Sequence, residues 1–137
     1  MKRAFIDANV ILRYLTKDPP EMAEAAMKTF VDAKNGKVSL LVANLTVAEV
    51  VWVLESFYKY SKNQIAETLT EFLMCDGLEV ETLDFLIEAL VVYQEKNLDF
   101  ADAFLAVCAL QKGTPTIYSF DVHLNRVDGI TVLKPSA

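Results

Sequence analysis

Near its start the chain reads Arg3-Ala4-Phe5-Ile6-Asp7-Ala8-Asn9-Val10-Ile11-Leu12. The run Arg3–Ile6 predicts a β-strand that ends at Asp7, and Val10–Leu15 predicts a short helix directly after it. A strand that passes into a helix is the first half of a right-handed crossover between parallel strands. This stretch therefore indicates an α/β fold with an acidic residue at the carboxyl end of its first strand.

The same alternation of strands and helices continues to the end of the chain. Further strands are predicted at Val38–Val42, Leu78–Val80, Thr116–Ser119 and Thr131–Leu133, and further helices at Glu21–Ala33, Val47–Tyr60, Asn63–Met74, Leu83–Lys96 and Phe100–Gln111. Strands separated by helices predict a mostly parallel sheet, and 137 residues suit a single domain, residues 1–137. In such sheets, sites form beyond the carboxyl ends of the strands.

Composition narrows the class of protein. The net charge is −6, which argues against binding nucleic acid through a broad basic surface, but not against brief contact with RNA through a bound metal. No apolar run is long enough to span a bilayer, and no signal-peptide cleavage site follows the first residues, so we expect a cytoplasmic protein. Cys75 and Cys108 lie in apolar segments without metal-ligand spacing, which predicts two buried free thiols.

Two acids are predicted near the carboxyl ends of the first two strands. Asp7 ends the first strand, where it could serve a site or could cap the next helix. Glu49 lies in Thr46-Val47-Ala48-Glu49, which matches a capping box with Thr46 as the N-cap. In that alternative, Glu49 bonds back to the helix start instead of serving a site.

Three more acids belong to the second half of the chain. Asp102 lies in a helix that is apolar nearly all round, where a buried charge is costly unless it is paired or binds metal. Asp99, three residues earlier, is expected to be the N-cap, with a supporting role at the site as an alternative. Asp121 follows the strand Thr116–Ser119 and could instead cap a turn through Val122–Arg126.

Taken together, these acids predict a metal centre. Strand ends and helix starts would bring Asp7, Glu49, Asp102 and Asp121 to one edge of the sheet. Clustered carboxylates raise one another's pKa values unless a cation neutralises them, and Mg²⁺ or Mn²⁺ prefers such oxygen ligands. The small polar residues Asn9, Thr46 and Ser119 could orient the carboxylates or a metal-bound water, or could be caps.

The remaining polar residues exclude some chemistry and suggest contacts. His123 is the only histidine, so a metal-free ribonuclease with paired histidines is ruled out. Arg13, Lys17 and Arg126 are candidates for contacts with an RNA backbone. Trp52 falls away from the apolar stripe of its predicted helix, so it is either an interface anchor or is covered by the helix Asn63–Met74.

Four stretches of this sequence resemble the acidic motifs of the PIN-domain family, and the chain is most similar to the VapC-type toxins of toxin–antitoxin pairs. The resemblance runs in order along the whole chain, through Phe5–Leu12, Leu45–Val50, Phe100–Ala106 and Ile117–Asp121. One departure is Phe120, where such motifs often have a polar or basic residue before the acid. Asp99 could also replace or assist Asp102 in binding metal.

The resemblance implies a three-layer α/β/α sandwich with a short, mostly parallel central sheet. It also implies Mg²⁺- or Mn²⁺-dependent cleavage of RNA with Asp7, Glu49, Asp102 and Asp121 around the metal, and inhibition by a small antitoxin protein. The excess of apolar residues further predicts a homodimer. The alternatives are a PIN-like nuclease of RNA processing without an antitoxin, an aspartate-nucleophile phosphatase and a non-catalytic interaction domain.

Overall fold

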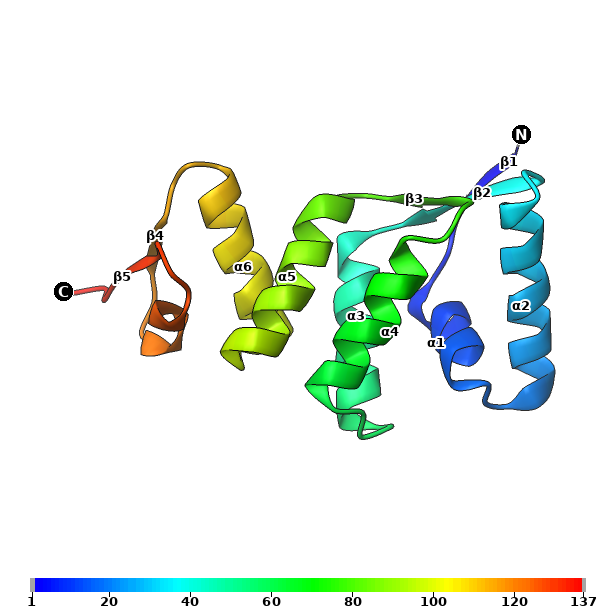
Figure 1. Ribbon diagram of the computed structural model, residues 1–137, viewed down its shortest axis with the longest axis horizontal. Coiled ribbons are helices and arrows are strands. Elements are labelled where there is room, and N and C mark those ends of the chain that lie inside the picture. Colours follow the sequence, from blue (N-terminus) through cyan, green and yellow to red (C-terminus); the bar gives the residue numbers. More distant parts are fainter. Residues whose placement is uncertain (1, 137) are drawn as a thin grey trace. The chain divides into compact units, whose positions relative to one another are not determined.

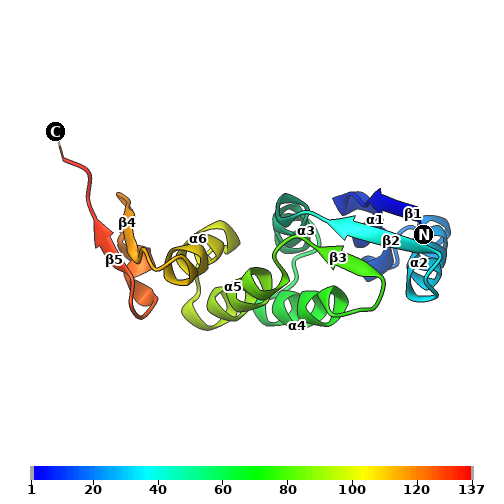
Figure 2. The ribbon, with the colours of Figure 1, turned by 90° about the horizontal axis from the view of Figure 1, so that it is seen from above.

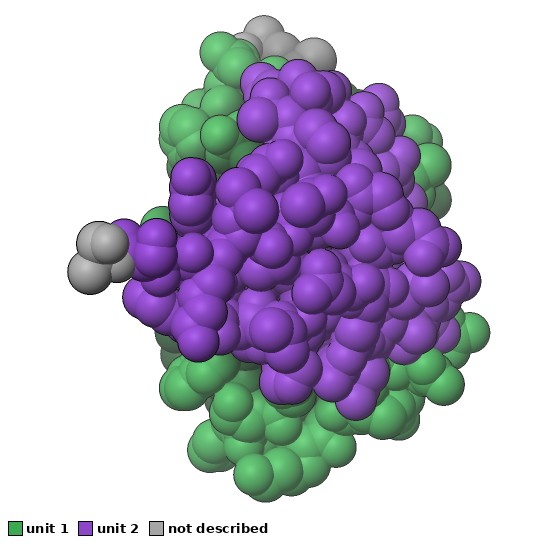
Figure 3. Space-filling model, turned by 90° about the vertical axis from the view of Figure 1, so that its left-hand side faces the viewer, with its two compact units in different colours: residues 1–83 green, residues 84–137 purple. Residues whose placement is uncertain are grey.

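The computed structural model describes residues 2–136, and these divide into two compact units. Unit 1 ends at Leu83 and unit 2 begins at Asp84, and Figure 3 shows them in different colours. Each unit is described by itself.

Unit 1 holds a small parallel sheet with four helices packed along it (Figures 1 and 2). Its elements are β1 (Lys2–Phe5), α1 (Ala8–Thr16), α2 (Pro20–Lys34), β2 (Val38–Val42), α3 (Asn44–Ser56), α4 (Lys62–Leu73) and β3 (Leu78–Val80). Within residues 2–83 the strand order is β1-β2-β3, and both strand pairs are parallel, with Ala4 opposite Leu40 and Leu40 opposite Leu78. The carboxyl ends of the strands therefore share one edge of the sheet.

Local signals in the sequence account for the helix starts in unit 1. α2 begins at Pro20, where proline is suited to the first helical position. α4 begins with a capping box, in which the Ser61 hydroxyl accepts from the Gln64 N–H and the Gln64 side chain accepts from the Ser61 N–H. The buried faces of the helices and of β2 then form the core, including Ile11, Val42, Val50, Leu54, Ile65 and Leu69.

β3 reaches β2 through a close approach that only glycine permits. Gly77 has a φ of +92°, and a Cβ there would lie 2.5 Å from the backbone of Ala33 in α2. Its carbonyl accepts a hydrogen bond from the Leu40 N–H (2.9 Å). Gly77 therefore fixes the register of β3 on the sheet.

Unit 2 contains two helices and a second, smaller parallel sheet. Its elements are α5 (Leu83–Lys96), α6 (Phe100–Gln111), β4 (Thr116–Tyr118), the 3₁₀ helix η1 (Val122–Arg126) and β5 (Thr131–Leu133). Within residues 84–136, β4 pairs with β5 in parallel, with Ile117 opposite Val132. Leu86, Leu90 and Tyr93 of α5 are fully buried, as is Ala106 of α6.

The predicted α/β class with parallel strands and surrounding helices is confirmed, and most predicted elements lie within two residues of their observed bounds. The helix α3 is present as predicted, but its predicted bounds are wrong, because it begins at Asn44 instead of Val47 and ends at Ser56 instead of Tyr60. The prediction that Cys75 is buried is wrong, because Cys75 follows the end of α4 and is exposed. Cys108 is half-buried, and both cysteines are free thiols. None of the helices in the described residues has the length and apolar character needed to cross a membrane.

Candidate functional site

Asp7 stands between β1 and α1, and its carboxylate has a structural role there. Its Oδ1 accepts a hydrogen bond from the Val10 N–H (3.1 Å), which makes Asp7 the N-cap of α1. The side chain is exposed, beyond the carboxyl end of β1. The capping role predicted as an alternative is therefore present, and it leaves Oδ2 available for another ligand.

Glu49 lies in α3 and takes no part in a capping box, so that predicted alternative is wrong. The N-cap of α3 is Ala43, and Thr46 lies inside the helix instead of at its cap. The N–H of Asn44 donates instead to Glu81 Oε1 (2.9 Å), and Asn44 Oδ1 accepts from the Thr82 hydroxyl (2.7 Å). These groups after β3 satisfy the start of α3 and explain why the helix begins earlier than predicted.

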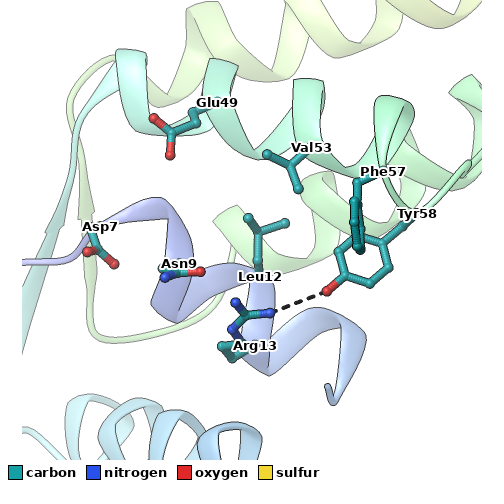
Figure 4. A pocket seen from close by; sticks show the side chains of 8 residues that line it. All are labelled: Asp7, Asn9, Leu12, Arg13, Glu49, Val53, Phe57 and Tyr58. Carbon is teal, nitrogen blue, oxygen red and sulfur yellow. Dashed lines mark hydrogen bonds between the residues drawn. The ribbon is translucent and has the colours of Figure 1, made fainter. Parts of the chain in front are cut away.

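Asp7 and Glu49 line one pocket between α1 and α3, with a volume of about 450 Å³ (Figure 4). Asn9, Leu12, Arg13, Val53, Phe57 and Tyr58 complete its lining. Glu49, Val53 and Phe57 follow one another at helical spacing along α3, so they form one wall. The structure thus brings together two of the predicted acids and the predicted supporting residue Asn9, whereas Thr46 is not part of this lining.

Asp99 and Asp102 lie at the start of α6 in unit 2. Asp99 is the N-cap, as predicted, with its Oδ1 accepting from the Asp102 N–H (2.8 Å). Asp102 is half-buried, and desolvation raises the pKa of its carboxyl above the ordinary value. The negative charges of Asp99 and Asp121 raise this pKa further, while His123 acts in the opposite direction.

Asp121 is the N-cap of η1, the role predicted for it as an alternative. Its Oδ1 accepts from the His123 N–H (2.8 Å) and lies 3.0 Å from His123 Nδ1. The Ser119 hydroxyl accepts from the Asp121 N–H (2.9 Å), so Ser119 orients the backbone of the acid. His123 is exposed, as expected for a lone histidine in a turn.

The acids of unit 2 do not form a complete metal site among themselves. The carboxylates of Asp99 and Asp121 both raise the Asp102 pKa, which is the repulsion that a divalent cation would relieve. Yet neither unit, over the residues described, brings three acidic, histidine or cysteine side chains close enough together to hold a metal ion. The oxygen donors of these acids fit Mg²⁺ or Mn²⁺ chemically.

One acid at the carboxyl edge of the sheet is absent from the sequence prediction. Glu81 follows β3 by one residue, in Leu78-Glu79-Val80-Glu81, so the strand-end rule that selected Asp7 also applies to it. Its carboxylate caps α3 through Asn44, which gives it a structural role. The sequence also does not predict the hydrogen bond from Arg13 to the Tyr58 hydroxyl (3.4 Å), because the two residues are far apart in the sequence.

Comparison with known proteins places these features in a family. A family model described as the PIN domain matches residues 4–130, which include all four predicted acids and parts of both units. The VapC ribonuclease of Aquifex aeolicus (strain VF5) is 26% identical to this chain over 127 residues, which cover 93% of each protein. Since the family match spans nearly the whole chain, this chain belongs to the PIN-domain family.

Proposed function

We propose that this protein is an endoribonuclease that hydrolyses RNA phosphodiester bonds with Mg²⁺ or Mn²⁺, and that it is the toxin of a toxin–antitoxin pair. The observation that carries this proposal is the pocket in which Asp7 and Glu49 face the same space. The charges of Asp99 and Asp121, which raise the pKa of Asp102, support it, as does the similarity to a VapC ribonuclease.

In this proposal the two units make up one domain, residues 1–137, and their acids share the metal. Asp7 and Glu49 come from unit 1, and Asp102 and Asp121 come from unit 2. The family match, which runs through both units without a break, supports this reading.

The bound metal would supply an activated water for attack on phosphorus and would neutralise the carboxylates. The four acids would hold it, and Asp99 would set the position of Asp102 through the Asp102 N–H. Asn9 projects from α1 beside Asp7 in the pocket and would hydrogen-bond the substrate or a water there (Figure 4). Ser119 would keep Asp121 in place through its backbone, and Thr46 has no assigned contact in this scheme.

The proposed protein partners are a small antitoxin and a second copy of the chain. An antitoxin arginine would pair with the clustered acids and displace the metal. Trp52 is 69% exposed on α3, and Leu45, about two helical turns earlier, is 81% exposed, which provides apolar anchors for an interface. Light scattering of the protein with and without the product of the adjacent small gene tests both partners, and a monomer that ignores that product contradicts them.

The test of the nuclease activity uses purified protein and single-stranded RNA, with EDTA and with Mg²⁺ or Mn²⁺ added back. We expect cleavage only with metal, and products without a cyclic phosphate. Asp102→Asn and Asp7→Asn should lose at least about a hundredfold in kcat. Asp84→Asn is the matched control, because Asp84 also lies in the first turn of a helix in unit 2.

Two results would count against this function, and one would change the residue that binds the metal. Cleavage that persists in EDTA would remove the metal mechanism. An active Asp102→Asn together with an inactive Asp99→Asn would transfer the ligand role to Asp99. Formation of an aspartyl-phosphate from a phosphomonoester would indicate a phosphatase instead.

A further inference from the structure

The pocket that holds Asp7 and Glu49 also has a cationic end. Arg13 lies one helical turn after Asn9 on α1, so both side chains project from the same face of the helix. Figure 4 shows Asp7, Asn9 and Glu49 toward one end of the pocket and Arg13 with Tyr58 toward the other. Leu12 and Val53 also line the pocket.

The Arg13 guanidinium is held in place but keeps its charge unpaired. Nη1 donates to the Asp18 carbonyl (3.2 Å) and to the Tyr58 hydroxyl (3.4 Å), which in turn donates to Asp18 Oδ2 (3.4 Å). Arg13 forms no ion pair with any carboxylate among residues 2–136, and its buried Nε has no acceptor there. A fixed cation with unused donors, in a protein of net charge −6, is suited to an anionic group of a ligand.

An aromatic ring lies next to this cation. Phe57, the C-cap residue of α3, lines the pocket while 72% of its surface is exposed. Its ring meets that of Tyr58 edge to face, with centroids 5.0 Å apart, and most of its surface is still exposed. Open aromatic faces beside a positive charge are the usual means by which proteins hold single-stranded nucleic acid.

We propose that Arg13 and Phe57 form a nucleotide subsite of the proposed ribonuclease, in which Arg13 binds a backbone phosphate next to the scissile one and Phe57 stacks on a base. The subsite rests on the proposed function, because it positions the strand relative to Asp7 and Glu49. Tyr58 is a positioning residue that holds the guanidinium through its hydroxyl. The cavity of about 450 Å³ is within the range of pockets that enclose small ligands.

The experiment measures binding of a fluorescein-labelled single-stranded oligoribonucleotide in EDTA, by anisotropy, over a series of salt concentrations. Arg13→Gln should weaken binding about tenfold and make the slope of log K against log[salt] shallower by about 0.7, the value for one lost phosphate contact. Arg13→Lys should restore the slope, since it keeps the cation. Phe57→Leu should weaken binding about tenfold with an unchanged slope, and Phe57→Trp should bind like the wild type.

Two variants control for structural effects. Tyr58→Phe removes the hydroxyl bonded to Arg13 but keeps the charge, so its salt slope should equal that of the wild type. Arg3→Gln removes an exposed arginine that is already paired with Glu79, and it should change neither affinity nor slope. With Mg²⁺, Arg13→Gln should raise KM about tenfold and leave kcat within about twofold, because it acts on binding.

The two proposals fail in different ways. If the wild type cleaves RNA but Arg13→Gln keeps the full salt slope, the subsite is wrong and the ribonuclease stands. The same conclusion follows if Phe57→Leu binds RNA as tightly as the wild type. If the wild type neither binds nor cleaves RNA, both proposals are overturned.

Discussion

At the scale of single residues, the acids combine structural and proposed functional roles. Asp7, Asp99 and Asp121 each cap a helix or 3₁₀ turn through one oxygen. The sequence predicts these caps well because capping depends on neighbours within three residues. It fails for Glu49, because the start of α3 is fixed by Glu81, a contact between residues 37 positions apart.

The raised pKa of Asp102 predicts how this residue affects the stability of the protein. Its raised pKa means that the folded protein binds a proton more readily than the unfolded chain, so the charged form of Asp102 lowers stability above that pKa. In EDTA at pH 7, Asp102→Asn should therefore raise the free energy of unfolding, by less than about 1 kcal/mol because solvent screens the half-exposed carboxyl. The gain should shrink as the pH falls through the Asp102 pKa. Urea unfolding at several pH values measures this, and a variant less stable than the wild type at pH 7 contradicts it.

At the scale of elements, the alternation of apolar and polar residues predicts most helices and strands within two residues, because periodicity is local. The close approach of α2 to β3 is not local, since it depends on Gly77 meeting Ala33. The sequence marks Asp76-Gly77 only as a turn. Only the structure shows that Gly77 also takes part in the sheet, where its carbonyl accepts a hydrogen bond from the Leu40 N–H.

The close approach of Gly77 to Ala33 predicts that two glycine substitutions differ greatly in how much they lower the free energy of unfolding. Gly77→Ala should lower the free energy of unfolding by about 3 kcal/mol, because it combines a strained positive φ with a clash against the backbone of Ala33. Gly36→Ala has a similar φ of +80° but meets nothing within 4 Å, so it should cost only about 1 kcal/mol. Thermal or urea unfolding of both variants measures the difference, and equal losses would show that the close approach adds nothing.

At the scale of the whole molecule, the sequence predicts one domain and one edge where the acids collect. The structure confirms a parallel arrangement inside each unit and places the acids in two groups, Asp7 with Glu49 and Asp102 with Asp99 and Asp121. Strand-end rules locate an acid relative to its own sheet. They contain no information on how two sheets join, which is why the complete metal centre stays a prediction.

The single-domain proposal predicts that a core mutation in unit 2 destabilises unit 1. Leu90 is fully buried in α5, and Leu90→Ala should cost about 2–5 kcal/mol. If the units fold as one domain, this loss should appear as faster hydrogen exchange of the slowest amides in α4, which belongs to unit 1. Leu69→Ala, a substitution of a fully buried residue in α4 itself, shows how much faster these amides exchange when α4 is destabilised directly. If Leu69→Ala speeds exchange in α4 and Leu90→Ala does not, the two units fold independently. A metal centre shared by Asp7 and Asp102 would then lack a rigid frame.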